Sequence, residues 1–150
     1  MKSLLASLLA SLLIVAPGFA QERDVPGFVS NVPGIVSKGF DTYRRDGALA
    51  AVNVWFTGSV RENDDSSQDD AVSRLDRVQG VLGRVYGFEP VRTVTLSRST
   101  RRVYVAVKFE KGVAWMSFDC YLPDKEWIIT RFDFNTNANI VLPPNILGGQ

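Results

Sequence analysis

The stretch from residue 101 to residue 134 constrains the fold more than any other part of this chain. It contains three runs of alternating side chains, separated by turn sequences at Lys111-Gly112 and Pro123-Asp124. Alternation is what a strand with one buried face requires, and a glycine-containing connection between two such runs is typical of a β-hairpin. A further run at 91–97, VRTVTLS, is rich in β-branched residues. The sequence therefore predicts four strands of one antiparallel sheet.

The alternation also predicts which side chains share a face of the sheet. The more apolar face is expected to pack against helices, and it contains Val103, Val105, Val107, Phe109, Ala114, Met116, Phe118, Cys120, Leu122, Ile128, Thr130, Phe132 and Phe134. The opposite face is expected to carry an unusual number of aromatic and charged side chains, among them Tyr104, Lys108, Trp115, Asp119, Tyr121, Trp127, Ile129, Arg131 and Asp133. Aromatic groups with a charged rim are typical of an interface.

The residues upstream of the sheet have a helical pattern. Apolar residues recur at steps of three and four within 37–59, where Gly47 is predicted to separate two helices and Trp55 to lie in the core. A second periodic segment at about 68–86 is predicted to place Val72, Leu75, Val78, Leu82 and Val85 on one stripe and to end at Gly87 and Pro90.

Between these helices lies the acidic stretch 61–70. It lacks the ligand spacing of a calcium loop, so it is predicted to be a solvated loop in which Ser67 and Asp70 cap the next helix. Helices followed by a run of antiparallel strands give an α+β fold, with N-terminal helices on one face of a curved sheet.

The N-terminus has the pattern of a cleavable secretory signal over residues 1–20, with Lys2, an apolar run at 4–15 and the small residue Ala20 before the expected cleavage point. The apolar run is shorter than the roughly twenty residues needed to span a membrane, so we expect no transmembrane anchor. These features predict an exported bacterial protein, either periplasmic or secreted.

The rest of the chain divides into three further segments. Residues 21–36 are predicted to be an apolar lead-in rich in Pro and Gly, which contains most of a tandem repeat, VPGFVSN followed by VPGIVSK. Residues 37–136 are predicted to form the α+β domain, and residues 137–150 an apolar C-terminal tail containing IVLPPNIL.

The residue types present exclude several kinds of chemistry. The chain has no histidine, which excludes nucleophiles activated by histidine and metal sites with histidine ligands. Its one cysteine, Cys120, cannot form an internal disulfide and is predicted to be a buried, inert thiol. The formal net charge is +1 and becomes zero without Lys2, so there is no general electrostatic reason to bind nucleic acid. We therefore expect no metal, no cofactor and no nucleic acid.

The order of the elements, together with FEKGVAWMSFDCYLPDKEWIITRFDFN, in which a tryptophan follows the last turn, resembles the nuclear-transport-factor-2-like (cystatin-like α+β) superfamily. It is similar in particular to small exported bacterial domains of that group, and the resemblance covers about residues 37–134. It implies a cone-shaped sheet wrapped against helices. The superfamily includes isomerases, dehydratases, transport adaptors and non-catalytic binding or dimerisation modules, and such a fold does not select among them.

Two functions follow as hypotheses. The first is a non-enzymatic interaction module that forms a homodimer, or binds a protein partner, through Tyr104, Trp115, Tyr121, Trp127 and Arg131. This face would otherwise be covered by the chain itself, either by the tail IVLPPNIL or by the VPG repeats.

The second hypothesis is a small enzyme or a carrier that holds an apolar ligand in the cone cavity. Asp119, Tyr104 and Tyr121 are the candidate catalytic residues, since an acid can serve as a base and a tyrosine hydroxyl can stabilise an oxyanion. By register, however, Asp119 points away from the helices, which favours a cross-strand polar pair, for example with Arg131. We therefore expect the non-enzymatic module.

Overall fold

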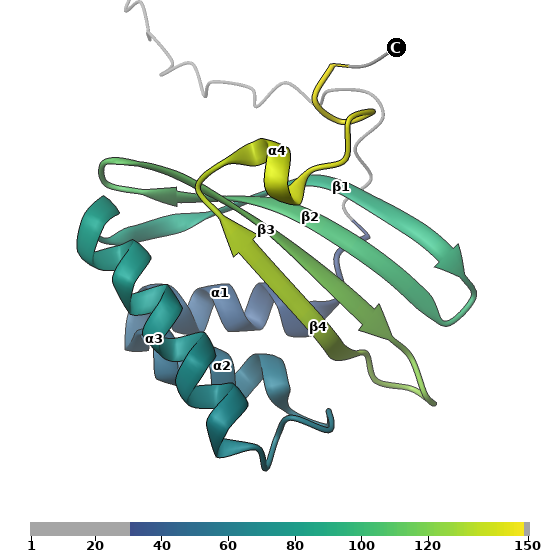
Figure 1. Cartoon of the computed structure of the whole chain (residues 1–150). Helices are drawn as coiled ribbons and strands as arrows, with labels where there is room; N and C mark the ends of the chain where they lie inside the picture. Colours follow the sequence, from purple (N-terminus) through teal and green to yellow (C-terminus); the bar gives the residue numbers. More distant parts are fainter. Residues whose placement is uncertain (1–30, 149–150) are drawn as a thin grey trace, which may run out of the picture.

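The computed structural model describes residues 31–148 and shows helices followed by a four-stranded sheet (Figure 1). The strands form one antiparallel sheet in the order β1-β2-β3-β4, which is not closed into a barrel. The elements are α1 (Gly34–Asp46), α2 (Ala48–Phe56), α3 (Asp65–Leu82), β1 (Val85–Ser97), β2 (Thr100–Phe109), β3 (Gly112–Tyr121), β4 (Ile128–Asn135) and the short helix α4 (Ala138–Val141). The α+β prediction is confirmed.

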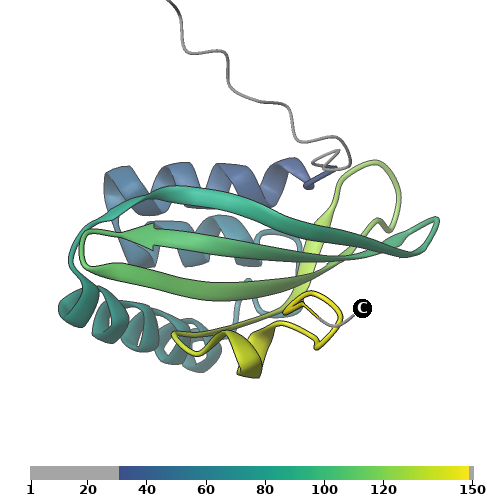
Figure 2. The same ribbon diagram turned by 90° about the horizontal axis from the view of Figure 1, so that it is seen from above.

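The sheet separates two layers of helices. Helices α1, α2 and α3 lie on one face, and α4 lies on the other (Figure 1). Seen from above, the strands pass over α1 and α2 (Figure 2). In this view α3 and the C-terminal part of the chain lie along the same edge of the molecule, although they lie on opposite faces of the sheet. In the following, the inner face is the one that packs on α1, α2 and α3, and the outer face is the opposite one.

A cluster of aromatic rings fills the space between the helices and the inner face. The fully buried Trp55 lies with its ring centroid 5.1 Å from Phe40 and 5.4 Å from both Phe118 and Phe132. Its Nε1 donates a hydrogen bond to the carbonyl oxygen of Val36 at 3.3 Å, so the buried indole has a polar partner. The predicted core position of Trp55 is confirmed.

The predicted inner face is confirmed for β2 and β3. The side chains buried there are Val103, Val105, Val107, Phe109, Ala114, Met116, Phe118 and Cys120. Gly47, at φ +90°, separates α1 from α2 as predicted.

The boundaries of α3 differ from the prediction. The helix begins at Asp65, because the side chain of Asp64 accepts a hydrogen bond from the backbone N–H of Ser67 and caps it; the predicted cap by Ser67 and Asp70 is wrong. The helix ends at Leu82 and is capped by Gly83, at φ +82°, so the predicted end at Gly87 and Pro90 is wrong; Val85 belongs to β1, where it is buried. Val85 follows Leu82 by three residues, a spacing that continues the helical pattern. The same spacing also fits the first inward residue of the next strand, which is what Val85 is.

The predicted alternation fails in β4 at one bulge. Asp119 pairs with Arg131 while the next residue, Cys120, pairs with Ile129, so Thr130 is an extra residue in β4. The hydroxyl of Thr130 donates to the carbonyl oxygen of Asp119 at 3.1 Å. Because side chains alternate with a period of two, the inserted residue reverses the faces of the β4 residues that precede it and leaves those that follow it unchanged. Ile129 is therefore buried and Thr130 exposed, the reverse of the prediction, whereas Phe132 and Phe134 are buried as expected.

The second VPG copy is part of the folded domain. Helix α1 begins at Gly34, so the predicted lead-in boundary at residue 36 is wrong, and Val36 is fully buried in the core. The predicted signal at 1–20 and all of the first VPG copy except Asn31 lie outside the described residues. Among the helices of residues 31–148, none has the length and apolar character needed to cross a membrane.

Candidate functional site on the outer face

The strand register builds the outer face in rows that run across the sheet. One row contains Arg102, Asp119 and Arg131, and a neighbouring row contains Tyr104, Ser117 and Asp133. A third row contains Ala106, Trp115 and Asn135. Four of the five predicted interface residues, Tyr104, Trp115, Tyr121 and Arg131, thus lie on one face.

Asp119 forms the predicted cross-strand polar pair, but with a different partner. Arg102 donates from Nε and Nη2 to the two carboxylate oxygens of Asp119, at 2.5 and 2.8 Å. These hydrogen bonds to the carboxylate raise the pKa of the Arg102 guanidinium above its ordinary value. Arg131 lies opposite Asp119, but its Nε donates instead to Asp133 at 2.7 Å.

This arrangement does not fit the roles that a base and an oxyanion donor would need. The Asp119 carboxylate accepts two hydrogen bonds from a permanent cation and faces away from the aromatic interior. Tyr104 pairs with Ser117, which is four residues from Tyr121 along β3, so the two tyrosines start about 13 Å apart along the strand direction. Tyr121 therefore lies apart from the other two candidate catalytic residues, and only Asp119 and Tyr104 line a common cleft.

Trp127 is not part of the outer face, so its predicted interface position is wrong. It packs against the core cluster between the sheet and the helices. The guanidinium of Arg101 lies over its ring, 4.5 Å from the centroid, and Arg101 pairs with the inward-facing Cys120. The bulge at Thr130 is the physical reason, because it reverses the faces of the residues that precede it.

The C-terminal segment, residues 136–148, lies over part of the outer face. Helix α4 contacts both β3 and β4 (Figure 1). Tyr104 and Leu142 are buried although neither belongs to the core cluster between the helices and the sheet. The turn into α4 is fixed by Asn135, whose side chain accepts from the backbone N–H of Asn137 at 2.8 Å. Part of the outer face is therefore covered by the chain's own tail IVLPPNIL, which was the alternative to cover by a partner.

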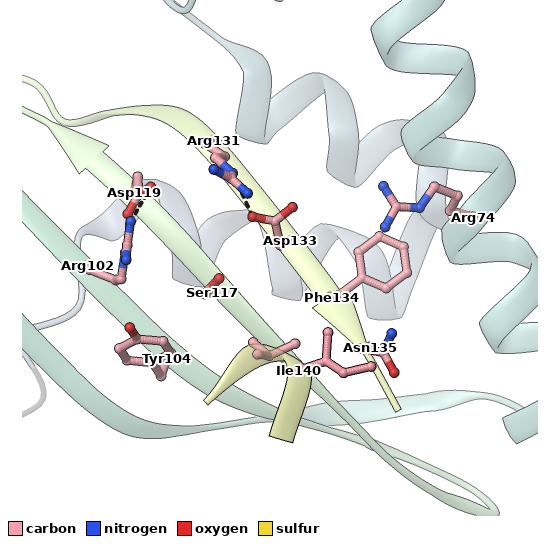
Figure 3. Close-up of a pocket in the computed structure, with 11 residues that line it drawn as sticks. Arg74, Arg102, Tyr104, Ser117, Asp119, Arg131, Asp133, Phe134, Asn135 and Ile140 are labelled. Carbon is pink, nitrogen blue, oxygen red and sulfur yellow. Dashed lines mark hydrogen bonds and ion pairs between the residues drawn. The ribbon is translucent and has the colours of Figure 1, made fainter. Parts of the chain in front are cut away.

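A cleft of about 360 Å³ remains between α4 and the sheet (Figure 3). The two ion pairs of the outer face form its floor, and Arg74 reaches it from α3 (Figure 3). Its lining is mostly polar and consists of Arg74, Arg102, Tyr104, Ser117, Asp119, Arg131, Asp133, Phe134, Asn135, Ile140 and Val141. The side chains that line the cleft can donate and accept hydrogen bonds, and they can bind groups of either charge.

Beyond the C-terminal segment, the outer face is open. Tyr121 is 40% exposed and Val113 is 39% exposed, while Trp115 is half-buried. The Arg131 side chain is 62% exposed. Aromatic and aliphatic groups therefore reach the surface next to ion pairs, which is the composition of a protein interface.

Cys120 points to the inner face and is buried, as predicted. Burial raises the pKa of its thiol to about 12, with a further rise from the neighbouring charge of Asp119. Such a thiol is protonated and unreactive at neutral pH. Within residues 31–148, no three side chains of His, Cys, Asp or Glu come together in a way that could hold a metal ion.

The sequence alone missed several residues of the site, among them Arg102, Arg74 and Ile140. Arg102 lies on the same face as Asp119 by simple alternation, so it could have been found. Arg74 and Ile140 reach the cleft from α3 and α4, and no local pattern indicates this.

No family model matches the chain, and neither a curated protein nor a solved structure matches it significantly.

Proposed function

We propose that this chain is an exported, non-enzymatic interaction module that pairs with a second copy of itself through the part of the outer face that α4 leaves exposed, including the ion pairs at the floor of the cleft. The observation that carries the proposal is the pattern of charges on that face. Arg102, Asp119 and Arg131 alternate in sign across one row, and Asp133 follows in the next. A two-fold axis brings the same patch of two copies together, and a patch that alternates in sign can match itself.

Three further observations support the proposal. Tyr121, two residues from Asp119 along β3, supplies exposed apolar surface beside the charges. Export is supported by the N-terminal pattern of Lys2, the apolar run at 4–15 and Ala20. Membership of the nuclear-transport-factor-2-like superfamily, which we also propose, is supported by helices that precede an antiparallel sheet and cover one face of it.

The alternative, an enzyme or carrier of an apolar ligand, needs space between the helices and the sheet. The rings of Phe40, Trp55, Phe118 and Phe132 occupy the middle of that space at centroid distances of 5.1 to 5.8 Å. Nothing in the described interior favours this alternative.

Sedimentation equilibrium of the chain that starts at Gln21 tests the proposal. We expect a dimer, and we expect Tyr121→Asp and Arg131→Glu each to shift it toward the monomer, because both side chains are exposed on the proposed contact surface. Arg98→Glu, in the exposed turn between β1 and β2, is the control for a change of charge and should leave the mass unchanged. A wild-type monomer at high concentration, or a dimer that neither variant weakens, would refute the proposal.

A further inference from the structure

The backbone edge of β4 is unpaired and regular. The strand order makes β1 and β4 the two edges of the sheet. The pairing of β1 is interrupted by three irregularities and the strand contains Pro90, features that protect an edge from accepting another strand. The pairing of β4 runs without interruption from Arg131 to Asn135. Alternate residues of this part of β4 therefore present N–H and C=O groups away from the sheet.

A groove follows this edge between β4 and α3. It consists of two clefts of about 360 and 200 Å³, both of which include Arg74. The guanidinium of Arg74 lies over the ring of Phe134, 4.8 Å from its centroid (Figure 3), and Arg74 lines both clefts. Ser67 and Asp70 line the α3 side of the first cleft, and Arg77 and Val78 line that of the second.

The lining of the groove is positively charged. It contains Arg61, Arg74, Arg77 and Arg131 against two acids, Asp70 and Asp133. Asp133 is bound to Arg131, and Asp70 lies 3.7 Å from Arg74. Neither Arg61 nor Arg77 forms an ion pair with another residue of the described part of the chain. These two cations are available to an acidic partner.

We propose that an extended, acidic peptide segment of another protein binds in this groove as a fifth strand beside β4. Its backbone would hydrogen-bond to the free edge, and the acidic residues on one side would face Arg74 and Arg77. A strand places every second side chain on the same face, so the segment is expected to alternate acidic with neutral residues. This site uses the edge of the sheet and α3, whereas the contact proposed above uses the outer face; Arg131 and Asp133 border both.

Nitrogen-15 NMR of the chain that starts at Gln21 tests the proposal with two defined probes. The first is an acetylated and amidated octapeptide that alternates Glu with Thr, and the second alternates Lys with Thr. At millimolar concentrations, the Glu peptide is expected to shift the amide signals of β4 and of the facing side of α3. The Lys peptide is expected to bind about tenfold more weakly or not at all, because like charges oppose each other in the groove.

Two charge-reversal variants and one control test whether the arginines of the groove bind the Glu peptide. Arg77→Glu leaves the contact of Arg74 with Phe134 intact and is expected to weaken binding of the Glu peptide about tenfold. Arg74→Glu should weaken it at least as much, and Arg98→Glu, in the turn between β1 and β2, should not change it.

Four outcomes would overturn the proposal, and the first three concern the peptides. They are the absence of shifts with the Glu peptide, equal shifts with the Lys peptide, and shifts confined to the outer face. A fourth is a change of the β4 signals with protein concentration that persists in the Tyr121→Asp variant, since the edge would then pair with a second copy. Loss of the outer-face dimer with retained peptide binding would refute the proposed function and leave this inference standing.

Discussion

Gly39 of α1 lies directly against the indole of Trp55 in α2. A Cβ atom on Gly39 would come within 1.9 Å of Nε1 and 2.3 Å of Cδ1 of Trp55. Trp55 is fully buried and surrounded by other rings, so it cannot move aside without displacing the core. The close approach of α1 and α2 therefore depends on the absence of a side chain at residue 39.

Gly39→Ala is expected to lower the free energy of unfolding by about 3 kcal/mol, because the added methyl group overpacks a filled core. Chemical denaturation monitored by tryptophan fluorescence measures the change. Gly80→Ala is the matched control, since no atom lies within 4 Å of a Cβ there and alanine favours the helix by about 1 kcal/mol. Equal stabilities of the two alanine variants would contradict the packing described for α1.

The ion pair between Arg102 and Asp119 is expected to couple more strongly than the pair between Arg131 and Asp133. The first is bidentate and less exposed, with side-chain exposures of 43% and 28% against 62% and 45%. A double-mutant cycle with alanine at both positions should give a coupling energy of about 1 kcal/mol for Arg102 and Asp119 and near zero for the other pair. Added salt should reduce the first value. A larger coupling for Arg131 and Asp133 would contradict the geometry.

Leu142 is expected to anchor the C-terminal segment to the outer face. Leu142→Ala removes three buried carbon atoms and should cost about 2 kcal/mol of stability. The variant should also increase the binding of a hydrophobic dye, because a loosened C-terminal segment would expose apolar atoms of the outer face. Ile140→Ala serves as the control: Ile140 is 66% exposed, so the change should stay within about 0.5 kcal/mol. If both variants behave alike, the segment is not held by Leu142.

The stability of the fold is expected to fall at alkaline pH partly through Cys120. Its pKa is raised from 9.0 to about 12 by burial, so the folded state keeps a proton that the unfolded chain loses. The stabilising contribution is therefore complete below about pH 9 and is lost as the pH rises toward 12. Tyr43, whose pKa burial also raises, contributes in the same direction.

Urea denaturation of the wild type and of Cys120→Ala between pH 8 and pH 11 measures the share of the thiol. The variant should lose less stability than the wild type over this range, while Tyr43 remains in both. A thiol reagent should react with native Cys120 far more slowly than with the unfolded chain. Rapid labelling of the native protein at pH 8 would contradict its burial.

The sequence determined those features that depend on local periodicity. Alternation over β2 and β3 identified the inner face, because successive side chains of a strand must point to opposite sides. The helical steps before and after Gly47 identified α1, α2 and the core position of Trp55. Composition alone excluded chemistry based on histidine.

Tertiary structure decided the features that depend on pairing between distant segments. The bulge at Thr130 arises where β4 meets β3, and it moved Trp127 from the predicted outer face to the core side. The partner of Asp119 is Arg102 and not Arg131, because the register places both arginines beside it and only the geometry selects one. The cover over part of the outer face comes from α4, which contacts β3 and β4 from the C-terminal end of the chain. A local pattern fixes which way a side chain points within its strand, whereas the contact energy that selects its partner exists only once the chain has folded.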